Sequence, residues 1–437
     1  MPDNADKKKE NRTQSARKVR PLVESMYLQA HQARDRGQKV AYCMVMSQYD
    51  EILAAMDIVP VWTENYGGVC AALGTAQPFL EKAESEGYSN LICGYARTGI
   101  GFDALRAEMG EAPQTPDGGM PMPDMLLGSS IGCDTRFKWY QALSYYMDVP
   151  IYCIDVIVPP VDRDLYEIKD FYVKYQAEQL RGLVEFLEKT TGRRLDPDRL
   201  MSIIHRAEEA RHWWWKAQQL CRAIPAPMTA RDHFNIFVPH HFMIGEEATL
   251  DFYKELYQEL KDRVDSGIGA VDNERFRLLF AGGLPPWHSM GIFSYFGSLG
   301  AVFPAQLAYP PPDPFTLPDN INDPIELMAL RSFERFTYRW EQAHRGCGDF
   351  WVQHILDLVP EFNIDGLVMH GVMSCRATSM GQIYYMQAVQ KYANLKTLFI
   401  ESDIVDIRTY SEAQMKIQID NFLETVETHR SNNEVRN

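Results

Sequence analysis

Apolar residues in this chain occur in short continuous runs that alternate with longer amphipathic stretches. Runs without polar alternation are typical of strands that helices cover on both faces, as in parallel sheets. Strands are predicted in two blocks, the first comprising Val40–Val45, Leu91–Tyr95, Met125–Ile131 and Ile151–Ile157, and the second Phe276–Ala281, Gly366–Val372 and Leu395–Glu401. This alternation predicts an α/β fold with two Rossmann- or flavodoxin-like parallel-sheet domains.

A helix-rich segment separates the two blocks of strands. Helical spacing of apolar residues predicts helices over Leu165 to Lys189, about Asp196 to Cys221 and about Glu246 to Val264. Asp196 is expected to cap the second of these helices, with Pro197 at its first position. We therefore predict four parts: a leader and helix at 1–37, an N-terminal α/β domain at 38–160, a helical segment at 161–268 and a C-terminal α/β domain at 269–437.

Composition and charge narrow the function classes. The 437 residues are 46% hydrophobic and 24% charged, as in ordinary globular proteins. Lys and Arg number 44 against 59 Asp and Glu, a formal net charge of −15, which argues against a nucleic-acid-binding protein. No run approaches the ~20 apolar residues that span a bilayer, so no membrane partner is expected. The lysine-rich stretch Met1 to Arg20 lacks the apolar core of a secretory signal and is predicted to be a disordered leader.

The eight cysteines contain no CxxC pair. This pattern excludes zinc ribbons, thioredoxin-like motifs and sequential ferredoxin runs, and a chain of this length is no disulfide scaffold. We therefore expect reduced thiols and a cytoplasmic location.

Three cysteines follow predicted strands, which is where ligands bind in open parallel sheets. These are Cys93, Cys133 and Cys375, whereas Cys347 lies in a glycine loop and is a weaker candidate. The others fall inside predicted strands or helices and are expected to be buried as small apolar residues: Cys43, Cys70, Cys153 and Cys221. Three separated thiolates fit a catalytic zinc site with an open position or a [4Fe–4S] cluster with one exchangeable iron. Unrelated buried cysteines explain the spacing equally well.

The stretches around these cysteines resemble a known family. They are Gly87-Tyr88-Ser89 through Cys93 to Arg97, Gly132-Cys133-Asp134 with Lys138, Gly366 through His370 to Cys375-Arg376, and Phe399 to Asp403. In this order and spacing they are similar to the benzoyl-CoA reductase / 2-hydroxyacyl-CoA dehydratase family, over about residues 38 to 426. The chain looks closest to the B-type subunit of ATP-dependent benzoyl-CoA reductase, with a 2-hydroxyacyl-CoA dehydratase subunit as the alternative.

The resemblance implies one [4Fe–4S] cluster per chain, held by Cys93, Cys133 and Cys375, with its fourth iron facing an acyl-CoA substrate or water. It also implies three partners: a related smaller cluster-bearing subunit, an ATP-hydrolysing activator with its own iron–sulfur cluster, and ferredoxin as electron donor. ATP is then bound by a partner, and this chain indeed lacks a GxxxxGK[ST] phosphate loop.

Two chemistries follow from the resemblance. In one, low-potential electrons reduce a thioester-activated aromatic ring to a cyclohexadiene-carbonyl-CoA. In the other, one electron forms a ketyl radical on the substrate, which then loses its 2-hydroxyl group. A non-catalytic iron–sulfur electron carrier, which needs no acyl pocket, is a further alternative.

Four polar residues are candidates for work at the substrate. Glu64, just past a short apolar run, is a candidate proton-transfer carboxylate, or else a cap or surface glutamate. Ser47 and Tyr49 follow the first strand and are placed to hydrogen-bond a thioester oxygen, or else only to form the turn. His370 is a candidate donor to cluster sulfur, or a core histidine with its partners satisfied. The loop Gly282–His288 is expected to approach CoA or substrate through its backbone.

Overall fold

The computed structural model describes residues 10–113, 115–160, 162–313 and 315–436. It contains two four-stranded parallel sheets surrounded by helices, which confirms the predicted fold class. The first sheet has the order β2-β1-β3-β4 and the second β6-β5-β7-β8. Their strands are β1 Val40–Cys43, β2 Val59–Trp62, β3 Met125–Ser129, β4 Ile151–Ile154, β5 Phe276–Gly282, β6 Ala301–Gln306, β7 Gly366–Val372 and β8 Lys396–Ser402.

Both sheets have a switch point beside their first strand. From β1 the chain goes out to β2 and returns to the other side of β1 with β3, and the second sheet repeats this path from β5. In flavodoxin-like sheets of this order, the loops after these strands diverge and leave a crevice beyond the carboxyl ends. The topology therefore places the candidate site residues at the carboxyl edges of the two sheets.

Three sequence predictions about strands need correction. The run Leu91–Tyr95 is not a strand, because it forms a turn that leads directly into a helix beginning at Gly94. Strands β2 and β6 were not predicted, and each contains a proline, Pro60 and Pro304. Both are edge strands, which pair with a neighbour on one side only. Proline has no backbone N–H, and an edge strand tolerates it because no hydrogen bond is needed on the unpaired side. Because each contains a proline, these two strands could be recognised only once the complete sheets were known.

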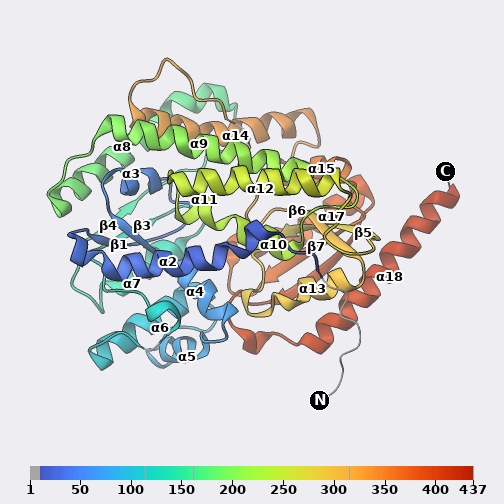
Figure 1. Cartoon of the computed structure of the whole chain (residues 1–437), viewed down its shortest axis with the longest axis horizontal. Coiled ribbons are helices and arrows are strands. Elements are labelled where there is room, and N and C mark those ends of the chain that lie inside the picture. Colours follow the sequence, from blue (N-terminus) through green and yellow to red (C-terminus); the bar gives the residue numbers. More distant parts are fainter. Residues whose placement is uncertain (1–9, 114, 161, 314, 437) are drawn as a thin grey trace.

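Helices flank both sheets and fill the segment between them (Figure 1). The first domain and its approach contain α1 Gln14–Arg17, α2 Val19–Gln32, α3 Asp50–Ala55, α4 Thr63–Ala72, α5 Gln77–Ser85, α6 Gly94–Met109 and α7 Asp134–Leu143. The middle segment contains α8 Leu165–Thr191, α9 Pro197–Leu220, α10 Ala230–Ile236, α11 Val238–Phe242 and α12 Glu247–Asp265. The second domain contains α13 Gly291–Ser298, α14 Pro324–Arg345, α15 Phe350–Glu361, α16 Arg376–Ser379, α17 Gln382–Ala393 and α18 Glu412–Arg436.

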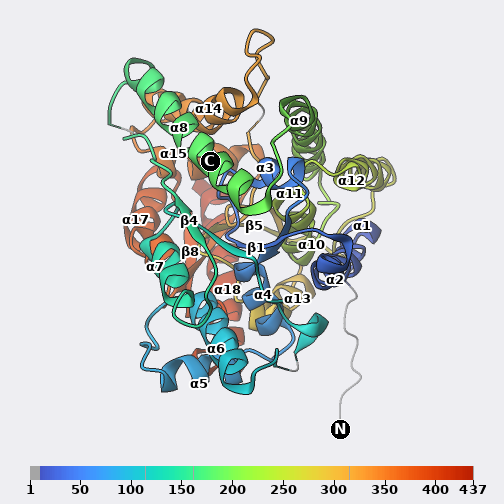
Figure 2. The ribbon, with the colours of Figure 1, turned by 90° about the vertical axis from the view of Figure 1, so that its left-hand side faces the viewer.

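The three helices predicted for the middle segment are confirmed as α8, α9 and α12. Asp196 caps α9 as expected, since its carboxylate accepts hydrogen bonds from the backbone N–H groups of Asp198 and Arg199. Helices α9 and α12 pack along each other, and α8 packs along α14 of the second domain. Together they form a layer over both sheets, and Figure 2 shows the sheets enclosed by helices. The layer thereby ties the two domains together.

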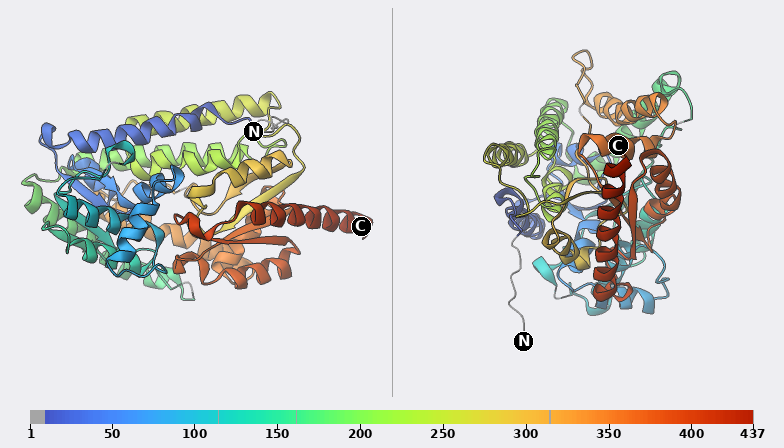
Figure 3. Two further views of the ribbon diagram at one scale, coloured as in Figure 1. Left: turned by 90° about the horizontal axis from the view of Figure 1, so that it is seen from below. Right: turned by 90° about the vertical axis from the view of Figure 1, so that its right-hand side faces the viewer.

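The start and the end of the described chain pack differently. The predicted disordered leader is wrong for residues 10–20, because α1 begins at Gln14 with Thr13 as its cap, while residues 1–9 lie outside the described residues. At the other end, α18 packs on β8 and runs along the second domain to the edge of the molecule (Figure 3). Among the helices of the described ranges, none has both the length and the apolar character needed to cross a membrane.

Candidate functional site

The three candidate cysteines occupy equivalent positions, each directly before a helix. Cys93 precedes α6, Cys133 precedes α7 and Cys375 precedes α16. For Cys93 this corrects the predicted strand end, whereas Cys133 and Cys375 do follow β3 and β7. All three thiols are free and partly buried. The first backbone N–H groups of a helix point toward such a position and favour negative charge there.

Cys93 and Cys375 meet at the junction of the two domains. The backbone N–H of Gly94 donates a hydrogen bond of 3.2 Å to Ser374 Oγ, so the residues beside the two cysteines are bonded to each other. Ser374 Oγ in turn donates to the carboxylate of Asp403, which follows β8. A Cβ atom at position 94 would lie 2.4 Å from Asp403 Oδ1, so glycine is required for this close approach.

Electrostatic effects link all three thiols. Burial raises the pKa of the Cys93 thiol, and the charges of Cys375, Cys133 and Asp403 act in the same direction. Burial also raises the pKa of Cys133, and the charge of Cys375 adds to this effect. Each thiol is thus within electrostatic range of the other two. The structure brings together three cysteines that are far apart in the sequence.

This arrangement has the donor chemistry of a cluster site. No three His, Cys, Asp or Glu side chains in the described ranges converge closely enough to ligate a single metal ion. In an iron–sulfur cubane each cysteine binds a different iron, so the ligands are spaced around a larger body. Three free, partly buried thiols at one domain junction fit such a group.

Glu64 lies beside Cys133 and is held by an arginine that sequence reasoning missed. Its Oε2 accepts hydrogen bonds of 2.9 Å from both the Val45 backbone N–H and Arg136 Nη2. The buried Arg136 guanidinium also donates to the backbone carbonyls of Val45 and Ile131. It therefore joins the loops after β1 and β3 to the carboxylate that follows β2. The guanidinium acts to lower the pKa of Cys133, although burial has the larger effect.

The hydroxyl groups of Ser47 and Tyr49 already have protein partners. Ser47 is fully buried and its Oγ donates a hydrogen bond of 2.8 Å to the Met44 carbonyl. Tyr49 is also fully buried, and its hydroxyl donates to the Leu127 carbonyl at 2.7 Å. The Ser47 contact agrees with the turn interpretation, whereas the Tyr49 hydroxyl ties the turn to strand β3. A contact with substrate stays a prediction.

His370 is enclosed within the second domain. Its Nδ1 contacts the carbonyl of Leu284 and its Nε2 lies 2.8 Å from Ser402 Oγ, which is satisfied when Nδ1 carries the proton. Burial lowers the pKa of His370 to about 4, so the ring is neutral at physiological pH. These partners agree with the core-histidine interpretation, and a role as donor to cluster sulfur stays a prediction.

An aromatic pocket of about 170 Å³ adjoins Glu64. Its wall includes Tyr95, Phe234, Phe237, Trp287 and Tyr309, with Glu64 as its one carboxylate among the described residues. Trp287 Nε1 donates to the Tyr95 hydroxyl, and the Tyr309 ring stacks on Phe237 with centroids 4.0 Å apart. We call this cavity the aromatic pocket.

The aromatic pocket lies close to the cysteines. Burial raises the pKa of Tyr95, and the nearby charges of Cys93 and Glu64 act in the same direction. Burial likewise raises the pKa of Tyr309, where the charges of Glu64 and Cys375 contribute. Trp287 belongs to the loop after β5 that the sequence indicated, whereas Tyr309 follows the unpredicted strand β6. Recognising β6 would have singled out Tyr309 as a residue at a strand's carboxyl end.

The remaining cysteines mostly match their predicted environments. Cys43, Cys70 and Cys221 are buried, which confirms the prediction. Cys153 is only partly buried, because its strand β4 lies at the edge of the first sheet. Cys347 is partly buried in the loop after α14.

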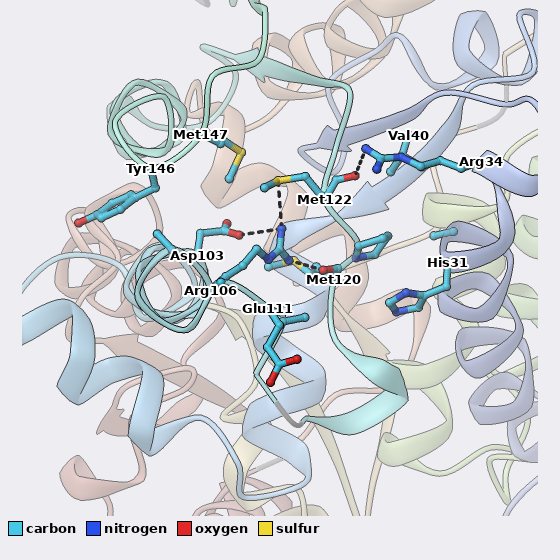
Figure 4. Close-up of a pocket in the computed structure, with 15 residues that line it drawn as sticks. His31, Arg34, Val40, Asp103, Arg106, Glu111, Met120, Met122, Tyr146 and Met147 are labelled. Atoms are coloured by element: carbon cyan, nitrogen blue, oxygen red, sulfur yellow. Dashed lines mark hydrogen bonds and ion pairs between the residues drawn. The ribbon is translucent and has the colours of Figure 1, made fainter.

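A larger cavity of about 500 Å³ lies beside the first sheet, near the start of β1 (Figure 4). Arg106 dominates its wall and is engaged by Asp103, Tyr42 and the Met120 carbonyl. Arg34 donates to the Met122 carbonyl across the same cavity. These groups bond to one another, and β1 enters the sheet here, so we assign this cavity no part in the site at the strands' carboxyl ends.

Comparison with known proteins gives consistent matches along the chain. A family model described as "2-hydroxyglutaryl-CoA dehydratase, D-component" matches residues 47–426. The chain is 25% identical over 428 residues to the (R)-phenyllactyl-CoA dehydratase alpha subunit of Clostridium sporogenes, covering 97% of this chain and 98% of that protein. It is 25% identical to the (R)-2-hydroxyisocaproyl-CoA dehydratase alpha subunit of Clostridioides difficile, covering 95% and 97%. It is 23% identical to the B-type subunit of benzoyl-CoA reductase from Thauera aromatica, covering 95% of each chain.

Proposed function

Because the chain belongs to the 2-hydroxyglutaryl-CoA dehydratase D-component family, we propose that it is the [4Fe–4S] subunit of an acyl-CoA enzyme driven by low-potential electrons. Relatives named as alpha or B-type subunits indicate a complex with partner subunits. The observation that supports the proposal most is that Cys93, Cys133 and Cys375 lie within electrostatic range of one another, beside a pocket.

Cys93, Cys133 and Cys375 would hold the cluster, which when bound supplies single electrons at low potential. Next to the cysteines, Tyr95 and Tyr309 are buried and form part of the pocket wall. Glu64, fixed by Arg136 and the Val45 N–H, is placed to hold or transfer a proton at the bound thioester. Exclusion of water protects a strongly reducing group and a reactive substrate from side reactions.

The first candidate reaction is the ATP-dependent reduction of benzoyl-CoA to a cyclohexadiene-carbonyl-CoA. The second is the dehydration of an (R)-2-hydroxyacyl-CoA, which the similarity to two dehydratase alpha subunits favours. In either case we propose a related smaller cluster-bearing subunit, an ATP-hydrolysing activator with its own iron–sulfur cluster, and ferredoxin as partners. The non-catalytic carrier is the weaker alternative, because a carrier has no use for an aromatic pocket beside the cysteines.

The test is anaerobic purification of the complex, followed by iron analysis and two assays. We expect about four iron atoms per chain and turnover of either benzoyl-CoA or a 2-hydroxyacyl-CoA, which identifies the reaction. Stoichiometric zinc in place of iron would contradict the proposal. A full iron content with no turnover of either thioester, in the presence of activator and ATP, would instead support an electron carrier.

A further inference from the structure

The aromatic pocket has the size of a six-membered ring. Its volume is about 170 Å³, and an apolar protein cavity of about 150 Å³ holds one benzene molecule. Its wall offers the faces and edges of several aromatic side chains, which bind another ring in edge-to-face or offset geometry. A two- or three-carbon acyl group would leave much of this volume empty.

The described residues that line the pocket offer no free cation to an acidic substrate. Among its described lining residues the one cation is Arg20, which contacts both carboxylate oxygens of Asp117 at 3.0 and 2.7 Å and Glu24 at 2.9 Å. Glu64 contributes a carboxylate of its own. A second carboxylate on the acyl group would therefore be desolvated without a partner.

Gly68 sets the width of the pocket. A Cβ atom at this position of α4 would lie 3.7 Å from the Trp287 ring, an ordinary contact, so the position faces the pocket and has space for one methyl group. At the neighbouring Gly67, a Cβ would lie 2.9 Å from Tyr95 Cδ1. A longer side chain at position 68 would occupy the space beside Trp287 and leave the cysteines untouched.

We infer that the acyl group bound by this chain is uncharged and about the size of a six-membered ring, an aryl or arylalkyl group, and that Gly68 is a specificity-determining residue. This inference rests on the proposed function. It selects aryl thioesters over short and over dicarboxylic ones within either candidate reaction. The carbonyl would lie toward Glu64 and the ring toward Phe234 and Trp287.

The test measures thioester binding to the assembled, cluster-loaded enzyme by anaerobic calorimetry without an electron donor. We expect benzoyl-CoA to bind at least about tenfold more tightly than propanoyl-CoA, and glutaryl-CoA to bind most weakly. Gly68→Leu should weaken benzoyl-CoA binding about tenfold and change propanoyl-CoA binding less than about twofold. Gly291→Leu at the start of α13, outside the pocket lining and with open space around it, should retain all three affinities.

A second narrowing variant guards against misfolding of Gly68→Leu. Leu73 lies at the rim of the pocket and is 50% exposed, so Leu73→Trp should fold and give the same selective loss. Equal affinity for glutaryl-CoA and benzoyl-CoA, or an equal loss for all thioesters in both narrowing variants, would overturn the inference. Binding without preference would overturn this inference alone, whereas no thioester binding at full iron content would overturn the proposed function.

Discussion

The candidate ligands depend on neighbouring residues that hold them in position. This holds for Cys93, Cys133 and Cys375. Cys93 is held in place through Gly94, whose N–H reaches Ser374 and whose missing side chain leaves room for Asp403. Cys133 has behind it a buried arginine that also fixes Glu64. Groups of this kind orient ligands and tune what they hold.

Replacing any one of the three cysteines should remove the cluster. Cys93→Ser, Cys133→Ser and Cys375→Ser should each lower iron from about four atoms per chain to near zero and abolish the visible absorbance, because serine is a poor ligand for this group. Iron analysis and absorption spectra of anaerobically purified variants check this. Cys43→Ser, at a fully buried position in β1, is the control that should keep its iron. Equal iron retention in all four variants would contradict the ligand assignment.

The sequence indicated the three thiols and Glu64 but not their supports. Strand ends and a family resemblance are properties of local sequence. The bonds from Gly94 to Ser374 and from Arg136 to Glu64 join residues 280 and 72 positions apart. Such pairs depend on how elements pack, which no local pattern specifies.

At the scale of elements, His370 ties β7 to its neighbours. Its ring contacts the loop after β5 through Leu284 and the end of β8 through Ser402. The neutral ring protonated at Nδ1 satisfies both contacts, and burial disfavours the addition of a second proton. Protonation would therefore loosen the carboxyl edge of the second sheet, where Cys375 and Asp403 begin their loops.

This predicts a measurable pH dependence. Burial lowers the pKa of His370 to about 4, below the ~6.5 of an unfolded chain, so the unfolded state binds a proton first as the pH falls. The stabilisation is complete above about pH 6.5 and is lost between about pH 6.5 and 4, by about 3 kcal/mol. Chemical denaturation at several pH values should show a shallower loss for His370→Gln than for the unmodified chain. His212→Gln, at an exposed position of α9, is the control. An unchanged slope in His370→Gln would contradict this account.

The apolar pattern predicted some strands and missed others. Continuous apolar runs predicted the central strands β1, β3, β5 and β7, and also the edge strands β4 and β8. The proline-containing edge strands β2 and β6 lack that signature. The run beginning at Leu91 was misread as a strand, since the signal for a helix start at Gly94 is weak without an Asp, Asn, Ser or Thr cap.

At the scale of the whole molecule, a buried ion pair joins the two domains. Arg97 of α6 is almost completely buried, and its Nη1 lies 2.8 Å from Glu84 and 3.1 Å from Asp406, which follows β8. Although burial acts to raise it, hydrogen bonds from Arg408 and Arg97 lower the pKa of Asp406 to about 2. The backbone N–H of Arg97 donates to the Cys93 carbonyl, so the ion pair also fixes the turn that carries this cysteine against the second domain.

Breaking this pair should affect stability and iron together. Arg97→Leu removes the contact of Asp406 with the first domain, while Arg408 still pairs with Asp406, and should lower the free energy of unfolding by about 1.5–3 kcal/mol. Iron retention should fall as well, because Cys93 and Cys375 come from different domains. Denaturation curves and iron analysis check both effects. Arg193→Leu removes a half-exposed pair with Asp57 and should cost about 0–1 kcal/mol with full iron. A stable, iron-replete Arg97→Leu would show that other contacts hold the domains.

Cys93 and Cys133 belong to the first domain and Cys375 belongs to the second. A group bound by all three cysteines therefore cross-links the two domains. Such a group stabilises the closed arrangement of the two domains by the difference between its binding free energies for the closed and open forms. Destruction of the cluster by oxygen would then loosen the contact between the domains as well as remove the redox group. Without the cluster, the domains should separate at the contact between Gly94 and Ser374. Protease digestion or hydrogen exchange should detect this opening first at these residues.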